Sequence, residues 1–256
     1  MIGMATMERS GRVSLVTGSS RGIGAEVARR LAASGDVVIV NYREKRARAE
    51  KVVAEIERTG GCAAAIGADL SDESNVVSMI SDIERRFGHL DVVVLNASGG
   101  LERNADPDYA MRLNRDAQVQ VIDHAQPILR RGGRVVFVTS HQSHFVGQQP
   151  VPDEYAPIAR SKRAGEDALR KMIQQLRDRG VDLTVVSGDM IDGTIIVRLL
   201  ERRNPEAVSA RRKHGELPTI EEFAATVVNA STAAVESGHT FYVGGADYLL
   251  PTEHVR

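Results

Sequence analysis

The chain has 256 residues, of which 42% are hydrophobic and 26% are charged, and its formal net charge is -1 at pH 7. This balance is typical of a soluble chain that forms one α/β domain or two small domains, and it lacks the basic excess of a nucleic-acid-binding protein. The single cysteine, Cys62, excludes an intrachain disulfide, and no run of about 18 apolar residues predicts a membrane span.

Residues 1–10 are predicted to be a flexible lead-in. They contain no continuous apolar core after a basic segment, so they do not have the pattern of a signal peptide. A cytoplasmic location is therefore the default expectation. Residues 11–256 show no internal repeat, no low-complexity tract and no linker rich in Pro or Ser, and we expect one domain there. The sequence predicts no metal site.

Short apolar runs alternate with helical patterns along nearly the whole of this domain. The helical stretches place apolar residues three or four positions apart, as in Ile23, Val27 and Leu31. The predicted strands are 12–18, 36–42, 62–70, 90–98, 134–140, 181–188 and 239–245. The predicted helices are 22–35, 44–61, 72–88, 107–130, 157–179 and 219–235.

The order of these elements predicts the fold class. Apolar strands without polar alternation, separated by helices, indicate a parallel sheet that is covered on both faces. Right-handed crossovers then favour a single doubly wound Rossmann domain of the α/β class, with a mostly parallel seven-stranded sheet and helices on both faces. Residues 194–215 break the rhythm with mixed charges and no strand pattern, and we predict that this irregular segment is a lid over the substrate.

The turn between the first strand and the first helix carries three glycines, in the sequence VTGSSRGIGAEVA. Gly18 permits a tight exit from the strand, and Gly22 and Gly24 let the backbone approach a pyrophosphate and pack closely. The following helix offers its N-terminal amides to the phosphates. This context predicts a dinucleotide site, to which the same turn also contributes Ser20, Arg21 and Ile23.

The end of the second strand indicates which nucleotide binds. An acidic residue there would bind the adenosine ribose of NAD, but the sequence VIVNYRE places Asn41, Tyr42 and Arg43 at that point. Arg43 and Arg21 offer two guanidiniums and no carboxylate, which suits the 2′-phosphate of NADP(H) better than NAD(H). The alternative is that both arginines are simply solvated.

These motifs, in this order, resemble the short-chain dehydrogenase/reductase family over roughly residues 11–250. Thr17 to Gly24 has the family's Thr-Gly-x-x-x-Gly-x-Gly form, and VVFVTS ends on Ser140, at the family's catalytic serine position. VSGD resembles the Pro-Gly turn over the nicotinamide, with Ser187 in place of proline. The resemblance implies that the cofactor also contacts Asp69, Leu70, Asn96, Ala97, Ser98, Lys162, Gly188 and Met190.

The resemblance also implies a mechanism. A hydride from NADPH reaches an electrophilic carbon, Ser140 holds the substrate oxygen, and a tyrosine donates the proton by general acid catalysis. Lys162 would bind the nicotinamide ribose and lower the pKa of the tyrosine, because a nearby ammonium favours the phenolate. Asn114 would help a chain of water molecules return the proton. The likeness further implies a small-molecule substrate and a homo-oligomer, either a tetramer or a dimer.

The tyrosine is the point at which this chain departs from the family pattern. The family spaces Tyr-x-x-x-Lys, but Ile158 stands four positions before Lys162, and Tyr155 stands seven before it. Pro157 predicts a helix that starts just after Tyr155, and from there the ring could still reach the site. We therefore expect Tyr155 to be the proton donor.

Three functions stay open on the sequence. The first is NADP(H)-dependent reduction of a ketone. The second is reduction of a conjugated C=C bond, because a tyrosine seven positions before the lysine resembles the enoyl-thioester reductases of the family. The third is dinucleotide binding without redox chemistry, which Ile158 keeps open. The loop before Tyr155 adds His141, Ser143 and His144, each of which could contribute a polar group to the site.

Overall fold

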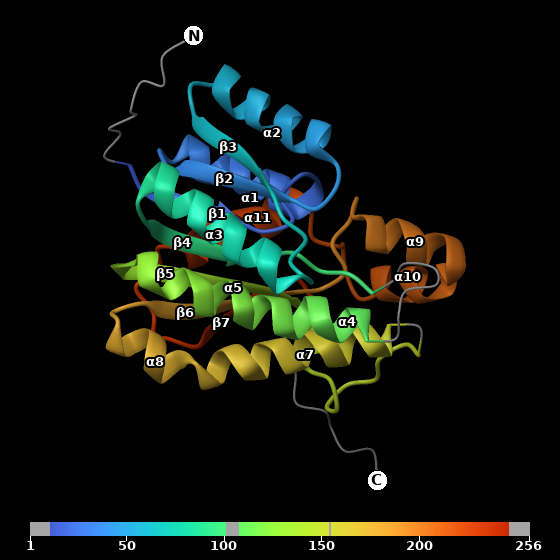
Figure 1. The fold of residues 1–256 in the computed structure, drawn as a ribbon. Helices are drawn as coiled ribbons and strands as arrows, with labels where there is room; N and C mark the ends of the chain where they lie inside the picture. The colour runs from blue at the N-terminus through green and yellow to red at the C-terminus, as the bar shows by residue number, and fades with distance from the viewer. Residues whose placement is uncertain (1–10, 101–107, 154, 246–256) are drawn as a thin grey trace.

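The computed structural model describes residues 11–100, 108–153 and 155–245, and the predicted lead-in at 1–10 lies outside these ranges. One seven-stranded sheet forms its centre, and every paired strand is parallel to its neighbour (Figure 1). The spatial order β3-β2-β1-β4-β5-β6-β7 confirms the predicted doubly wound α/β fold. The strands are β1 Val13–Val16, β2 Val37–Tyr42, β3 Cys62–Gly67, β4 Leu90–Leu95, β5 Leu129–Ser140, β6 Asp182–Gly188 and β7 His239–Val243.

Helices cover both faces of the sheet (Figure 1). One face carries α1 Gly22–Ala33, α2 Arg46–Arg58 and α11 Ile220–Ala230, and the other carries α3 Glu73–Phe87, α5 Ala117–Ala125 and α7 Ala156–Lys171. The shorter helices are α4 Tyr109–Met111, α6 His141–His144, α8 Ile173–Asp178, α9 Ile195–Arg203 and α10 Pro205–Arg212. Within the ranges that the structure describes, none of the helices has the length and apolar character needed to cross a membrane.

Alternate residues of each strand supply two separate layers of core. Leu15 of β1 joins the cluster beneath α3, α5 and α7, whereas its neighbour Val16 joins the cluster beneath α1, α2 and α11. β5 repeats this division with Phe137 and Val138. Because successive side chains of a strand point to opposite faces, a strand that is covered on both faces must be apolar at nearly every position. The strands therefore read as continuous apolar runs in the sequence.

Two predicted helices are interrupted. The prediction over 107–130 begins one residue outside the described ranges, and in place of one helix the chain forms α4, a π-helical segment Arg112–Asp116, α5 and a 3₁₀ turn Gln126–Ile128. The prediction over 157–179 divides at Met172 into α7 and α8. The backbone keeps right-handed helical angles on either side of the π-helical segment and at Met172, so the apolar spacing does not reveal the interruptions.

The segment predicted to be irregular, 194–215, instead contains α9 and α10. The Thr194 Oγ1 accepts a hydrogen bond from the Val197 N–H at 3.4 Å, and the Asn204 Oδ1 accepts one from a backbone N–H of α10 at 3.1 Å. Each helix therefore begins at a side-chain cap. Val197 and Val208 pack in a small cluster of their own. Helices this short carry too few apolar repeats to be recognised in the sequence.

Candidate active site

A cavity of about 720 Å³ opens at the carboxyl ends of the strands, where doubly wound sheets bind their ligands. It is walled by the glycine turn after β1, by the ends of β2, β4, β5 and β6, and by α9. All the residues that the sequence predicted to contact the cofactor line this cavity, and so do Ser140 and Tyr155. Tertiary structure therefore brings together predicted cofactor residues that are up to 172 positions apart, from Gly18 to Met190.

The glycine turn is pressed against the end of β4. A Cβ on Gly18, whose φ is 61°, would lie 2.9 Å from the Ala97 Cα, and a Cβ on Gly24 would lie 2.5 Å from the Asn96 Nδ2. The Asn41 Oδ1 accepts a hydrogen bond from the Gly18 N–H at 3.0 Å, so Asn41 also fixes the turn from β2. No larger side chain fits at Gly18 or Gly24 without moving backbone, which explains the glycines at these two positions.

The end of the cavity beside β2 is cationic. Arg43 donates a hydrogen bond to the Tyr109 hydroxyl, and its guanidinium carbon lies 6.0 Å from the centre of the Tyr109 ring. Arg21, Lys45 and Arg48 line the same cavity. Sequence reasoning missed Lys45 and Arg48, because the mixed-charge run REKRAR has the pattern of a solvated helix face. It also missed Tyr109, which reaches Arg43 from 66 positions away. This wall suits an anionic group such as a phosphate.

Lys162 lines the cavity from α7 with only 8% of its surface exposed. Burial lowers the pKa of its ammonium to about 8, and the Glu166 carboxylate one helical turn away acts in the opposite direction. Among the residues that the structure describes, none hydrogen-bonds or forms an ion pair with this ammonium. A buried cation that lines a cavity is stabilised by a ligand that brings oxygen acceptors to it.

The Tyr155 hydroxyl reaches the serine at the end of β5. Tyr155 immediately precedes α7 and is 4% exposed, and its Oη lies 3.3 Å from the Ser140 Oγ. The Ser143 Oγ of α6 lies 2.8 Å from the Ser140 Oγ, so three hydroxyl groups meet at this wall.

Burial raises the pKa of Tyr155 above its ordinary value, and hydrogen bonds from Ser140 and Ser143 offset this only in part. Removing the phenolate from water therefore outweighs the two hydroxyls that stabilise it. The expectation that Lys162 lowers the pKa of the tyrosine stays a prediction.

Ile158 forms part of the cavity wall beside Tyr155. It is buried, packs with Tyr155 and Ala159, and approaches Gly100 so closely that a Cβ there would lie 3.3 Å from the Ile158 Cγ1. Ile158, at the position where the family pattern has tyrosine, therefore contributes an apolar side chain to the cavity wall. The phenol enters the site from the residue before the helix instead.

Asn114 does not line the cavity. It lies in the π-helical segment, where its Nδ2 donates to the Gly99 carbonyl and to the Ser161 Oγ, each at 2.9 Å, and its Oδ1 accepts from the Gly99 N–H at 3.2 Å. These bonds tie the loop after β4 to α7. The Asn114 side chain therefore supports the wall of the site, and its predicted part in returning the proton stays a prediction.

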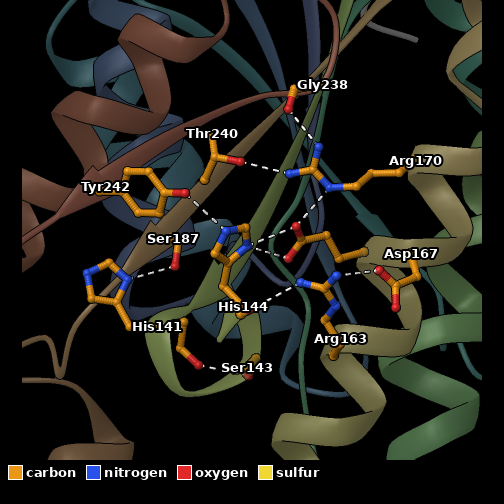
Figure 2. Close-up of polar contacts among 12 residues, drawn as sticks. His141, Ser143, His144, Arg163, Asp167, Arg170, Ser187, Gly238, Thr240 and Tyr242 are labelled. Atoms are coloured by element: carbon orange, nitrogen blue, oxygen red, sulfur yellow. Dashed lines mark hydrogen bonds and ion pairs between the residues drawn. The ribbon is translucent and has the colours of Figure 1, made fainter. Parts of the chain in front are cut away.

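A cluster of polar and charged side chains, including His144 of α6 and Arg170 of α7, links these two helices (Figure 2). The Glu166 carboxylate accepts hydrogen bonds from the His144 Nδ1 and the Arg170 Nε, each at 2.9 Å. Burial by itself would raise the pKa of Glu166, but the hydrogen bonds and charges of His144 and Arg170 outweigh it and hold this pKa below its ordinary value. Sequence reasoning identified His144 and missed Glu166, because only the fold places α6 beside α7.

Three observations indicate that the cavity suits a phosphate-bearing dinucleotide. The glycine turn leaves backbone exposed at the start of α1, the wall beside β2 is cationic, and Lys162 offers a buried ammonium to an oxygen-bearing ligand. In the described part of the chain, no group of three or more His, Cys, Asp or Glu side chains is arranged to hold a metal ion.

Comparison with known proteins identifies the family that this chain matches. A family model described as short chain dehydrogenase matches residues 12–204. The chain is 39% identical over 167 residues to a hydroxynaphthalene reductase-like protein of Metarhizium robertsii, a match that covers 63% of this chain and 61% of that protein. It is 34% identical over 189 residues to the 1-cyclohexenylcarbonyl-CoA reductase of Streptomyces collinus, covering 71% of this chain and 65% of that protein. The matches therefore span less than two thirds of the length of either relative.

Solved structures share the fold over most of the chain. The angucycline C-6 ketoreductase LanV with bound NADP superposes with a TM-score of 0.79 at 27% identity, over 93% of this chain and 97% of that chain. A short chain dehydrogenase from Burkholderia cenocepacia J2315 in complex with NADP superposes with a TM-score of 0.79 at 28% identity, over 93% and 98% of the two chains.

Proposed function

This chain belongs to the short-chain dehydrogenase family, and from that premise we propose that it is an NADP(H)-dependent oxidoreductase that reduces a ketone of a small molecule. The observation that carries the proposal is the contact of the Tyr155 Oη with the Ser140 Oγ at 3.3 Å, in the wall of a cavity that Lys162 also lines. That arrangement places a proton donor and an oxygen-binding hydroxyl side by side.

The choice of cofactor rests on the cavity wall. The turn containing Gly18 and Gly24 would hold the pyrophosphate at the start of α1, and Arg21 and Arg43 would bind the 2′-phosphate of NADP(H). Lys162 would hold the nicotinamide ribose hydroxyls. The similar ketoreductase LanV and the similar Burkholderia dehydrogenase bind NADP, which supports this choice. When bound, NADPH supplies the hydride.

The chain's own task is to hold the substrate oxygen and to deliver a proton to it. Ser140 donates a hydrogen bond to that oxygen. Tyr155 is protonated at neutral pH, because the ordinary pKa of tyrosine is near 10 and burial raises it further. As negative charge develops on the substrate oxygen, the phenol O–H bond breaks and the new O–H bond of the alcohol forms. The phenolate that remains is reprotonated before the next turnover.

The proposal is tested by mixing purified protein with NADPH and a panel of ketones and following the absorbance of NADPH. Tyr155→Phe should lose turnover but keep its affinity for NADPH, because the phenol touches the reacting oxygen and not the phosphate-binding turn. Wild-type rates in the Phe variant would exclude Tyr155 as the donor. If the wild-type protein binds NADPH but reduces no compound, the non-catalytic dinucleotide-binding function is the correct one.

A second candidate function is reduction of an enoyl thioester. Two observations favour it: Tyr155 stands seven positions before Lys162, and the chain is similar to a 1-cyclohexenylcarbonyl-CoA reductase. In that reaction the Tyr155 hydroxyl would stabilise the enolate oxygen while the conjugated C=C bond is reduced. A crotonyl thioester in the same assay separates the two functions, since activity on it without activity on ketones selects enoyl reduction.

The segment 194–215 is proposed to act as a lid. Ile195 and Ile196 are exposed on the first turn of α9 and line the cavity. The Arg211 Nη2 pairs with the buried Asp189 Oδ2 at 2.6 Å, which fastens α10 to the turn after β6. Apolar side chains on this wall favour an uncharged, apolar substrate, so Ile196→Asp should raise KM for such a ketone more than it lowers kcat.

The homo-oligomer, either a tetramer or a dimer, and the cytoplasmic location that the sequence led us to expect are retained as proposals. Light scattering of the purified protein tests the first, and fractionation of cells that express the chain tests the second.

A further inference from the structure

A third hydroxyl lies behind the serine and the tyrosine. Ser143 is completely buried in α6, and its Oγ lies 2.8 Å from the Ser140 Oγ. The Ser140 Oγ in turn lies 3.3 Å from the Tyr155 Oη. Ser143 does not line the cavity, so its hydroxyl has access to the other two hydroxyls and not to a substrate.

The short helix that carries Ser143 is held on both sides (Figure 2). On one side, the His141 Nε2 donates to the Gly244 carbonyl at 3.0 Å and the His141 Nδ1 lies 2.7 Å from the Ser187 Oγ. Burial lowers the pKa of His141, so the ring is neutral and accepts the Ser187 proton. These two bonds join α6 to the ends of β6 and β7.

On the other side, His144 fixes the helix to α7 and β7. Its Nδ1 donates to the Glu166 carboxylate at 2.9 Å, its Nε2 lies 3.1 Å from the Tyr242 Oη, and its carbonyl accepts from the Arg163 Nη1 at 2.7 Å. A hydroxyl carried by a helix with so many side-chain anchors has a set position relative to Ser140. The anchors lie two positions before Ser143 and one position after it in the sequence.

We propose that Ser143 is a positioning residue for the reduction: its hydroxyl donates to the Ser140 Oγ, which leaves the Ser140 proton for the substrate oxygen. After proton transfer Ser143 keeps donating to Ser140, and Ser140 turns its own proton to the Tyr155 phenolate. The inference rests on the proposed function, because it assigns a task within that reaction.

The number of available protons supports this role. Ser140 has one hydroxyl proton and is in contact with two other hydroxyls. If Ser140 donated to Ser143, it would have no proton for the substrate oxygen. With Ser143 as the donor, Ser140 and Tyr155 both direct their protons to the substrate. No covalent bond to Ser143 forms or breaks in this scheme.

The groups that act on the Tyr155 pKa indicate that hydroxyl groups stabilise the phenolate. Burial raises the pKa of the phenol, and Ser140 and Ser143 are the groups that lower it. The surrounding elements also carry ionisable groups. These include His141 and His144 of α6, Arg160, Lys162, Arg163, Glu166, Asp167, Arg170 and Lys171 of α7, Asp189 after β6, and His239 and Tyr242 of β7. The causes that act most directly on the Tyr155 pKa are burial and the two serine hydroxyls.

The first test compares wild type with Ser143→Ala in the oxidation of 1-tetralol by NADP⁺, as a function of pH. Oxidation requires the phenolate, so the rising limb of kcat with pH reports the Tyr155 pKa. A lost hydrogen bond to a charged group should move this limb upward by about one to two pH units. The reduction of α-tetralone at neutral pH should fall about tenfold in kcat with little change in KM. An unmoved limb with wild-type kcat overturns the inference.

A second measurement does not depend on turnover. The absorbance of the phenolate, taken as the difference between each protein and its Tyr155→Phe version, gives the Tyr155 titration directly. Ser143→Ala should shift it upward, and an unchanged titration overturns the inference even if the tetralone assay shows no activity. A wild-type protein that reduces neither α-tetralone nor any other ketone of the panel would count against the proposed function instead. The two failures are therefore distinguishable.

Two further variants complete the test. Ser231→Ala removes another buried serine hydroxyl, which bonds to the Val228 carbonyl at 2.7 Å far from the cavity, and it should leave both titrations unchanged. Ser143→Cys keeps nearly the same volume but has only a weak donor, so it should shift the limb in the same direction as alanine. It serves as the test variant if the alanine protein does not fold.

Discussion

Replacing Lys162 with methionine should stabilise the cofactor-free protein at neutral pH while removing its activity. Lys162 is 8% exposed, and burial lowers the pKa of its ammonium from 10.5 to about 8. A charged group in this position destabilises the fold, and the proposed contact with the cofactor would offset that cost. Methionine has a similar length and no charge, so it removes the desolvation penalty.

The size of the effect follows from the two pKa values. The folded value lies below the unfolded one, so between pH 8 and pH 10.5 the unfolded chain binds more protons, and stability rises with pH in that window. At about 1.4 kcal/mol for each pKa unit, the charged lysine costs about 3 kcal/mol at pH 7 and about 1 kcal/mol at pH 9.5. The stability gained by Lys162→Met should therefore be about 2 kcal/mol smaller at pH 9.5 than at pH 7.

Urea unfolding of both proteins at the two pH values measures this. Lys171→Met is the matched control, because Lys171 is exposed at the end of the same helix, and its effect should be small and equal at both pH values. The reasoning is refuted if Lys162→Met is less stable than wild type at neutral pH, or if its advantage does not decrease with rising pH. NADPH should stabilise the wild type but not the variant.

Three other substitutions test the remaining parts of the site. Arg43→Ala should weaken NADPH binding about tenfold or more, with little change for NADH in the same fluorescence titration, whereas Arg46→Ala, outside the cavity, should bind both normally. Gly24→Ala places a Cβ 2.5 Å from the Asn96 Nδ2, so thermal unfolding should occur at lower temperature and NADPH binding should be lost; an unchanged Tm and affinity would contradict the close approach. Glu166→Gln leaves His144 and Arg170 without their buried anion and should lower the free energy of unfolding by about 3 kcal/mol at neutral pH. Because the pKa of Glu166 is lowered by folding, the stability that its charge contributes is present above the unfolded value of 4.5 and is lost as pH falls through the lower folded value, so urea unfolding should show the two proteins converging in acid.

The sequence by itself determined the layered fold and one end of the site. A strand covered on both faces must be apolar throughout, and a helix on a sheet must repeat its apolar residues every three or four positions. Both patterns can therefore be recognised in a short stretch of sequence. The glycine turn is local too, because Gly18 to Gly24 connects β1 directly to α1. The residues of the glycine turn line the cavity together for that reason. The π-helical segment and the short helices α9 and α10 leave no such periodic signal.

Only the tertiary structure decided how the catalytic end is arranged. The contact between Tyr155 and Ser140 depends on how α7 packs against the end of β5, and no spacing in the sequence reports that distance. Burial, which sets the pKa of Lys162 and of Tyr155, is likewise a property of the packed chain. The Asn114 side chain is engaged by Gly99 and Ser161, partners 15 and 47 positions away. Local patterns specify elements, whereas solvation and long-range hydrogen bonds exist only once those elements are packed together.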